Sequence, residues 1–161
     1  MDHNHSRTLV FRMQGSEVGA PAVIPPIDGS GTTKADGFEL GLFDPATDDQ
    51  IGTVLETLAD IRPVDGGLAI VGTQVFRLAD GELTVRGLTS VAPTTHGSPE
   101  YTHITGAIPR DDENNVLSGT GAYEGATGSA RLSGAVNLAD FESEGRVAFN
   151  CLFVLRLSLA Q

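Results

Sequence analysis

Five glycines punctuate the segment from Val116 to Leu138, VLSGTGAYEGATGSARLSGAVNL, and separate two short apolar alternations. Helices rarely tolerate glycine at this density, because each glycine in a helix interior costs about 1 kcal/mol relative to alanine. Strands that bend at tight glycine corners accommodate such a pattern. The segment therefore predicts a strand, a glycine corner and a second strand.

The glycine spacing does not fit a phosphate-binding loop. Gly121 and Gly125 are one residue too far apart for the G-x-G-x-x-G pattern, and no lysine follows them. No amphipathic helix opens after Gly128, so no helix N-terminus is available to hold a phosphate. These glycines are interpreted as a structural corner.

Short alternating segments recur along the rest of the chain and are joined by turns rich in Asp, Asn, Gly and Pro. We expect strands at 7–14, 38–43, 50–61, 67–78, 82–91, 100–108, 116–123, 129–138 and 146–159. This succession predicts an all-β fold, an eight-stranded antiparallel closed barrel with an extra N-terminal strand or loop.

The chain is expected to form one domain. Residues 1–6 are polar and predicted to be disordered, and residues 7–161 are predicted to form the single barrel domain. Within it, residues 15–37 combine glycines, prolines and an apolar patch, a composition too broken for a regular element. We expect this segment to be a loop that covers one mouth of the barrel.

The last predicted strand is apolar on both faces. Val147, Phe149, Cys151 and the following odd-numbered residues share one side, and Leu152 and Val154 lie on the other. One face would line the lumen, and the second would contact a covering loop or another subunit. The sequence therefore predicts a homodimer or homotrimer.

Composition excludes several classes of function. The chain has 161 residues, of which 40% are hydrophobic, and a formal net charge of -11. Nucleic acids and anionic membranes both need a basic protein face, so neither is expected as a partner. With no apolar run of membrane-spanning length and no secretory signal, a cytoplasmic protein is expected. The single cysteine cannot form an internal disulfide and is expected to act as a small buried hydrophobe.

Four blocks carry a resemblance to a known family: Gln50–Thr53, Arg62–Leu68, Leu78–Leu83 with Gly87, and Leu117–Gly128. The last block resembles the glycine–aromatic corner of the allene oxide cyclase and dirigent-protein barrels. In order and spacing the four blocks are most similar to those of the small bacterial barrel cyclases of polyketide biosynthesis, a group that includes spirotetronate-forming Diels–Alderases.

The resemblance implies an eight-stranded barrel that folds a linear apolar substrate in its lumen and steers an intramolecular cyclisation, such as a [4+2] reaction, without a cofactor. Glycine or aliphatic residues stand where large aromatics are expected in that family, so a roomier lumen is predicted. The residues that this register assigns to substrate binding are Phe38, Ile70, Gly72, Gln74, Phe76, Val91, Ile104, Ile108, Leu132, Gly134 and Val136.

No catalytic residue is assigned from the sequence. A [4+2] closure needs only positioning, with Gln74 as a possible hydrogen-bond partner of a substrate carbonyl. Acid–base cyclisation or isomerisation, as in allene oxide or spiroketal chemistry, would need a lumen group with a shifted pKa. The candidates are Gln74, Tyr123, His103 and Glu56. A non-catalytic lipocalin-like carrier and a dirigent-type stereochemical guide stay open, because fold does not fix function.

No metal is expected. The acidic run from Asp111 to Asn115 resembles a calcium loop only in composition, since Val116 stands where an EF-hand requires glycine. The four histidines are spread too widely to predict a ligand set. The expected partner is a small apolar molecule.

Overall fold

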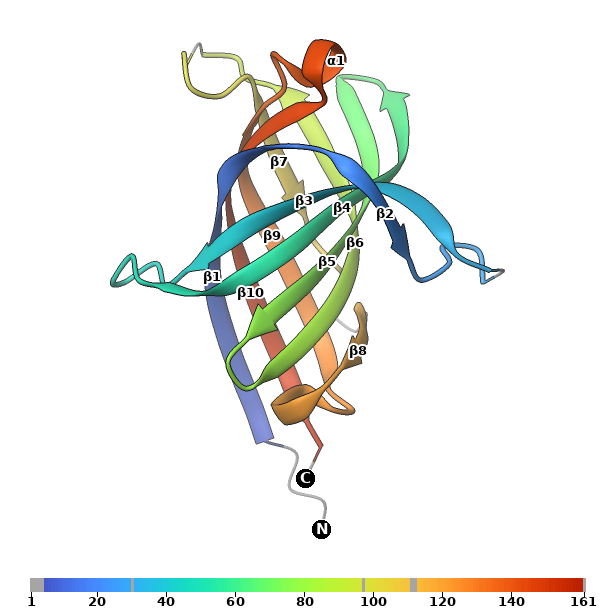
Figure 1. Ribbon diagram of the computed structural model, residues 1–161, viewed down its shortest axis with the longest axis vertical. Helices are drawn as coiled ribbons and strands as arrows, with labels where there is room; N and C mark the ends of the chain where they lie inside the picture. The colour runs from blue at the N-terminus through green and yellow to red at the C-terminus, as the bar shows by residue number, and fades with distance from the viewer. Residues whose placement is uncertain (1–4, 30, 97, 111–112, 161) are drawn as a thin grey trace.

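The computed structural model describes residues 5–29, 31–96, 98–110 and 113–160. These residues form one antiparallel sheet, a single turn of 3-10 helix (η1) and a short α-helix (Figure 1), which confirms the all-β prediction. The elements are β1 (His5–Val18), β2 (Ala20–Ile24), β3 (Thr33–Phe43), β4 (Gln50–Val64), β5 (Gly67–Leu78), β6 (Gly81–Pro93), β7 (His103–Ala107), β8 (Val116–Gly119), η1 (Gly121–Tyr123), β9 (Thr127–Asn137), α1 (Phe141–Glu144) and β10 (Arg146–Leu159).

The sheet rings round on itself. Its strand order is β1-β10-β9-β7-β6-β5-β4-β3-β2, and β8 pairs with β6. The strand β1 also pairs with β3, through Arg12–Phe43, Met13–Leu42 and Gln14–Gly41. The start of β1, the end of β10, η1 and the β5–β6 turn lie at one end of the molecule, and α1 lies at the other (Figure 1). Because side chains alternate along each strand, one face of every strand points into the ring.

Several strand boundaries differ from the sequence prediction by a few residues, and three differences change the type of structure. The strand predicted at 116–123 ends at Gly119, because Gly121 and Gly125 adopt φ of 58° and 70° and turn the chain through η1. The turn after β9 contains α1. His5 and Ser6, expected to be disordered, begin β1, and residues 1–4 lie outside the described residues.

The segment 15–37 does not cover a mouth of the ring as a loop. Its residues 20–24 form β2, which pairs only with β3 and therefore tolerates Pro21 at a sheet edge. Beyond β2, Arg86 donates from Nη2 to the carbonyl of Pro25 at 2.6 Å and from Nη1 to that of Pro26 at 3.1 Å. Arg86 alternates with the inward-facing residues of β6, so this contact holds the loop on the outer face of the sheet.

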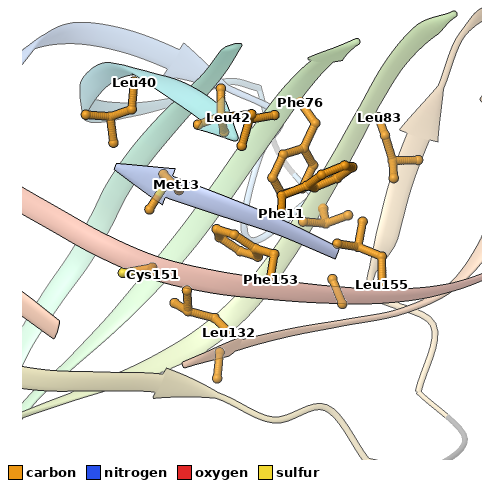
Figure 2. Packing of buried hydrophobic residues seen from close by; sticks show 14 of the residues in the cluster. Phe11, Met13, Leu40, Leu42, Phe76, Leu83, Leu132, Cys151, Phe153 and Leu155 are labelled. Atoms are coloured by element: carbon orange, nitrogen blue, oxygen red, sulfur yellow. The ribbon is translucent and has the colours of Figure 1, made fainter. Parts of the chain in front are cut away.

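The half of the interior nearest the termini is filled by aromatic and aliphatic side chains. The ring of Phe76 packs between those of Phe11 and Phe153, at centroid distances of 5.5 and 5.0 Å. Figure 2 shows these rings converging from β5, β1 and β10, with Leu83 and Leu155 beside them. Tyr123 of η1 is also fully buried at this end. The space left for a ligand therefore lies toward the α1 end.

Candidate functional site

A carboxyl group lies inside the ring. Glu56 stands on β4 between Val54 and Leu58 on the inward face, and only 3% of its surface is exposed. Its direct partner on β5 is Gln74, which is also buried. Gln74 Nε2 donates a hydrogen bond of 2.9 Å to Glu56 Oε1.

The second oxygen of this carboxyl group, Oε2, has no hydrogen-bond partner among the described residues. Burial away from water raises the pKa of Glu56 to about 8, against the smaller lowering effect of the hydrogen bond from Gln74. Glu56 is therefore predominantly a neutral carboxylic acid at pH 7. A buried polar group without a partner is rare in folded proteins and is a feature of functional sites.

Glu56 lines a cavity of about 40 Å³ in the interior. The walls are apolar apart from two threonines and the thiol of Cys151. Leu58, Thr105 and Leu138 are only partly buried and mark its outer end, close to α1. The lining residues are Met13, Glu56, Leu58, Ile70, Thr89, Val91, Thr105, Leu132, Val136, Leu138, Val147, Phe149 and Cys151.

Two glycines make room for these side chains. A Cβ atom at Gly72 would lie 2.9 Å from Gln74 Nε2 and 3.2 Å from Thr89 Oγ1, so the Glu56–Gln74 pair occupies the space that a side chain would take. A Cβ atom at Gly134 would lie 2.6 Å from the Cα of Cys151, which lets β9 and β10 approach closely beside the cavity. The cavity is much smaller than the roomy lumen expected from the glycine and aliphatic residues at positions 72, 91, 132 and 134, because the side chains of Gln74 and Cys151 lie close beside the two glycines.

The structure brings most of the predicted binding residues to the interior. Ile70, Val91, Leu132 and Val136 line the cavity. Gly72 shares the inward face of β5 with Ile70, and Gly134 shares that of β9 with Leu132 and Val136. Phe38, Gln74 and Phe76 are also buried but do not line this cavity. The ring of Phe38 packs against that of Phe149, with the two ring centroids 5.3 Å apart.

The prediction that Ile104 and Ile108 face the interior is wrong. Their side chains are 56% and 78% exposed. The strand β7 pairs Thr105 with Val91 on one side and with Gly134 on the other, and these residues face inward. Even-numbered residues of β7 therefore point outward, since a shift of one residue exchanges the two faces of a strand.

Two of the four candidate catalytic residues lie away from the cavity. His103 is half-buried on β7, with its Nδ1 atom 2.7 Å from Thr102 Oγ1, and it is not a wall of the cavity. Tyr123 lies at the end opposite α1, where its hydroxyl donates a 2.9 Å hydrogen bond to Asp80. Burial and this hydrogen bond raise the pKa of Tyr123 to about 12, which suits a structural role.

Sequence reasoning missed several walls of the cavity. Phe149 and Cys151 belong to the alternating face of the last strand, so the periodicity contained a signal for them. Met13 continues the alternation of Leu9 and Phe11 in the first predicted strand, and Leu138 continues that of Leu132 and Val136, so the same signal was present for both of these walls. Burial, with a smaller contribution from the nearby Glu56, raises the pKa of Cys151 to about 12 and keeps it a thiol.

The described residues contain neither a helix long and apolar enough to cross a membrane nor a group of three or more His, Cys, Asp or Glu side chains that could hold a metal ion. Asp111 and Asp112 of the acidic run lie outside the described residues.

Comparison with known proteins assigns no family to this chain. No protein-family model matches the chain, and no curated protein matches it significantly. The function must therefore be argued from the cavity and its buried carboxyl group.

Proposed function

We propose that this protein is a cofactor-free cyclase or isomerase that binds an apolar substrate in the interior of a closed eight-stranded barrel. The eight strands of this barrel are β1, β3, β4, β5, β6, β7, β9 and β10. The proposal of closure is supported by the pairing of β1 with both β10 and β3. The resemblance of the four sequence blocks, in order and spacing, to the polyketide barrel cyclases supports the reaction class.

One observation carries the proposal: the uncompensated oxygen of Glu56 at an apolar cavity. A neutral carboxylic acid in such an environment donates a hydrogen bond or a proton to an oxygen atom of the substrate. Donation to a carbonyl group withdraws electron density from a conjugated double bond, which lowers the barrier to ring closure. General acid catalysis of this kind contributes about 10²–10⁴-fold to a rate.

The apolar walls supply the second component of catalysis. Ile70, Leu132 and Val136 come from different strands and restrict how a flexible chain can fold between them. Holding the reacting atoms in near-attack geometry removes much of the entropic barrier to cyclisation. A substrate larger than the present cavity enters by displacing the partly buried Leu58 and Leu138 at its outer end.

The proposal is tested with neutral linear trienones that can close by [4+2] addition, a step that needs only a donor to the carbonyl oxygen. Chromatography detects products of unchanged mass. We expect the protein to accelerate this conversion, Glu56→Met to abolish that acceleration, and Glu142→Gln, an exposed change in α1, to leave it intact. The rate should be constant below about pH 8 and fall above it, as the acid ionises.

Two outcomes would contradict the proposal. If the protein binds these probes but converts none, a carrier function is favoured. If Glu56→Met converts them as fast as the unmodified chain, catalysis does not involve this carboxyl group.

A further inference from the structure

Few of the residues that line the cavity are polar. Besides Glu56, only Thr89, Thr105 and the thiol of Cys151 are polar among the described residues that line it. None of these lining residues is Lys, Arg or His, so the cavity offers no positive charge to a ligand.

The hydrogen bond from Gln74 decides which carboxyl oxygen carries the proton. Gln74 Nε2 donates to Glu56 Oε1, so Oε1 acts as the acceptor and the acid proton resides on Oε2. Oε2 is buried and has no hydrogen-bond partner among the described residues. Glu56 therefore supplies an unsatisfied O–H donor to a cavity whose other polar groups are two threonine hydroxyls and a thiol.

We propose that this cavity selects ligands whose buried end is an uncharged hydrogen-bond acceptor, such as a ketone, ester or ether oxygen, and rejects carboxylates. This inference rests on the proposed function in one respect, the site itself, and it names the class of substrate that the site would take. An acceptor oxygen satisfies the Oε2–H group without burying a charge. A carboxylate would bring a full negative charge into an apolar cavity without a cation to compensate it, which carries a large desolvation cost.

An ammonium ligand is the competing class, because it could pair with an ionised Glu56. Such a pair requires both charges to leave water, and the Coulombic attraction repays this cost only when the remaining N–H groups also find acceptors. The cavity that Glu56 lines offers mainly apolar surface, to which Ile70, Leu132 and Val136 contribute, and few acceptors for the remaining N–H groups. The geometry therefore favours the neutral acceptor.

The selection should depend on pH through Glu56 alone. The groups that face it are Gln74 from β5, Thr89 from β6, Thr105 from β7 and Cys151 from β10. Of these only Cys151 titrates, and burial raises its pKa to about 12, so it remains neutral over the range of interest. Ionisation of Glu56 removes the donor and places a negative charge beside the ligand oxygen.

The experiment compares four six-carbon probes, 2-hexanone, hexane, hexanoate and hexylammonium, by NMR chemical-shift titration of the full chain. At pH 7 we expect 2-hexanone to bind about fivefold more tightly than hexane, the gain typical of one net hydrogen bond. Hexanoate should bind at least about tenfold more weakly than the ketone. Between pH 7 and pH 9 the ketone affinity should fall by about tenfold.

Two variants separate the donor from a merely structural role. Glu56→Gln retains an N–H donor that does not titrate, so ketone binding should persist and lose its pH dependence. Glu56→Met removes the donor, and the preference for ketone over hexane should disappear. Thermal unfolding of each variant establishes that it folds, and the pH series on the unmodified chain tests the proposal even if a variant does not.

Tighter binding of hexylammonium or hexanoate than of the ketone at pH 7 would overturn the inference, as would a ketone affinity that is constant up to pH 9. These readouts measure binding and not turnover. Ketone selection without conversion of any substrate would leave the inference standing and reject the proposed catalysis. Conversion without ketone selection would do the reverse.

Discussion

Gln74 and Glu56 face each other in register on β5 and β4, and the amide nitrogen of Gln74 lies 2.9 Å from the carboxyl oxygen Oε1 of Glu56. This contact joins two polar side chains that are 4% and 3% exposed inside a ring whose interior is mostly apolar. It satisfies one carboxyl oxygen and leaves the other without a hydrogen-bond partner among the described residues.

The first prediction concerns stability against pH. Glu56 has a pKa of about 8 in the folded protein and 4.5 as its ordinary value, so the folded state retains a proton that the unfolded state loses. The free energy of unfolding should therefore decrease by roughly 1.4 kcal/mol per pH unit between these two values, and this contribution levels off above the folded pKa. Below the ordinary value it is fully present.

Urea unfolding at intervals from pH 4 to pH 9 measures this effect, with Glu56→Gln as the comparison. The difference in stability between the unmodified chain and the variant should grow in favour of the variant as the pH rises. A constant difference across the range would show that Glu56 titrates normally in the folded state.

The second prediction concerns the end of the sheet near the termini. Tyr123 donates to Asp80 at 2.9 Å, and Arg7 both pairs with Asp80 and lies 5.3 Å from the centre of the Tyr123 ring. Tyr123→Phe keeps the ring and removes the hydroxyl, so we expect a loss of about 1–2 kcal/mol in the free energy of unfolding. Tyr101→Phe, a matched change outside this cluster, should cost less. Equal losses in chemical denaturation would contradict the structural role of the Tyr123 hydroxyl.

The third prediction compares two glycines on inward faces. At Gly134 a Cβ atom would meet the backbone of Asn150 and Cys151, which cannot move aside, whereas at Gly87 its nearest neighbour is the Ala107 methyl group at 3.4 Å. Gly134→Ala should therefore destabilise the fold by about 3 kcal/mol or prevent folding, and Gly87→Ala should cost less than about 1 kcal/mol. Thermal melts of the two variants provide the measurement. A well-folded Gly134→Ala protein of normal stability would show that β9 and β10 are not so closely apposed.

The fourth prediction tests the attachment of the segment after β2. Arg86 binds the carbonyls of Pro25 and Pro26 and donates from Nε to Thr73 Oγ1 at 2.9 Å. Arg86→Met keeps much of the aliphatic stem and removes these donors, so residues around Pro25 should become more susceptible to limited proteolysis. Arg62→Met, at an exposed position, is the control. Since the contact lies on the outer face, ligand affinity in the cavity should change little; a large loss of affinity would place this segment in the binding route.

Sequence periodicity predicted much of the strand content, because alternation at period two is a local property that each strand carries by itself. The alternating face of the last strand was identified from Val147 to Leu159, and these odd-numbered positions face inward. For β7 the same method selected the wrong face. Thr105 and Ile104 belong to a short strand of five residues in which both faces carry apolar side chains, so the pattern alone could not orient it.

The candidate site could be predicted only in part. Several apolar walls were identified, since inward-facing positions of neighbouring strands share a pattern. Glu56 was one weak candidate among several, because its sequence neighbours do not reveal that its side chain is enclosed and half unpaired. Its importance follows from burial and from a missing hydrogen-bond partner, both of which depend on residues distant along the chain.

The amino-acid sequence by itself determined that this chain forms β-strands joined by glycine-rich and acidic turns, because those preferences are local. Tertiary structure decided which of these residues lie opposite one another. The β4–β5 pairing shifts register between Ala59 and Arg62, next to Asp60, whose φ is 50°. Without that irregularity the pairing would slip by one residue, and Glu56 would lie opposite Val75 instead of Gln74. A single backbone bulge, which no local pattern announces, thus places the buried acid beside its partner amide.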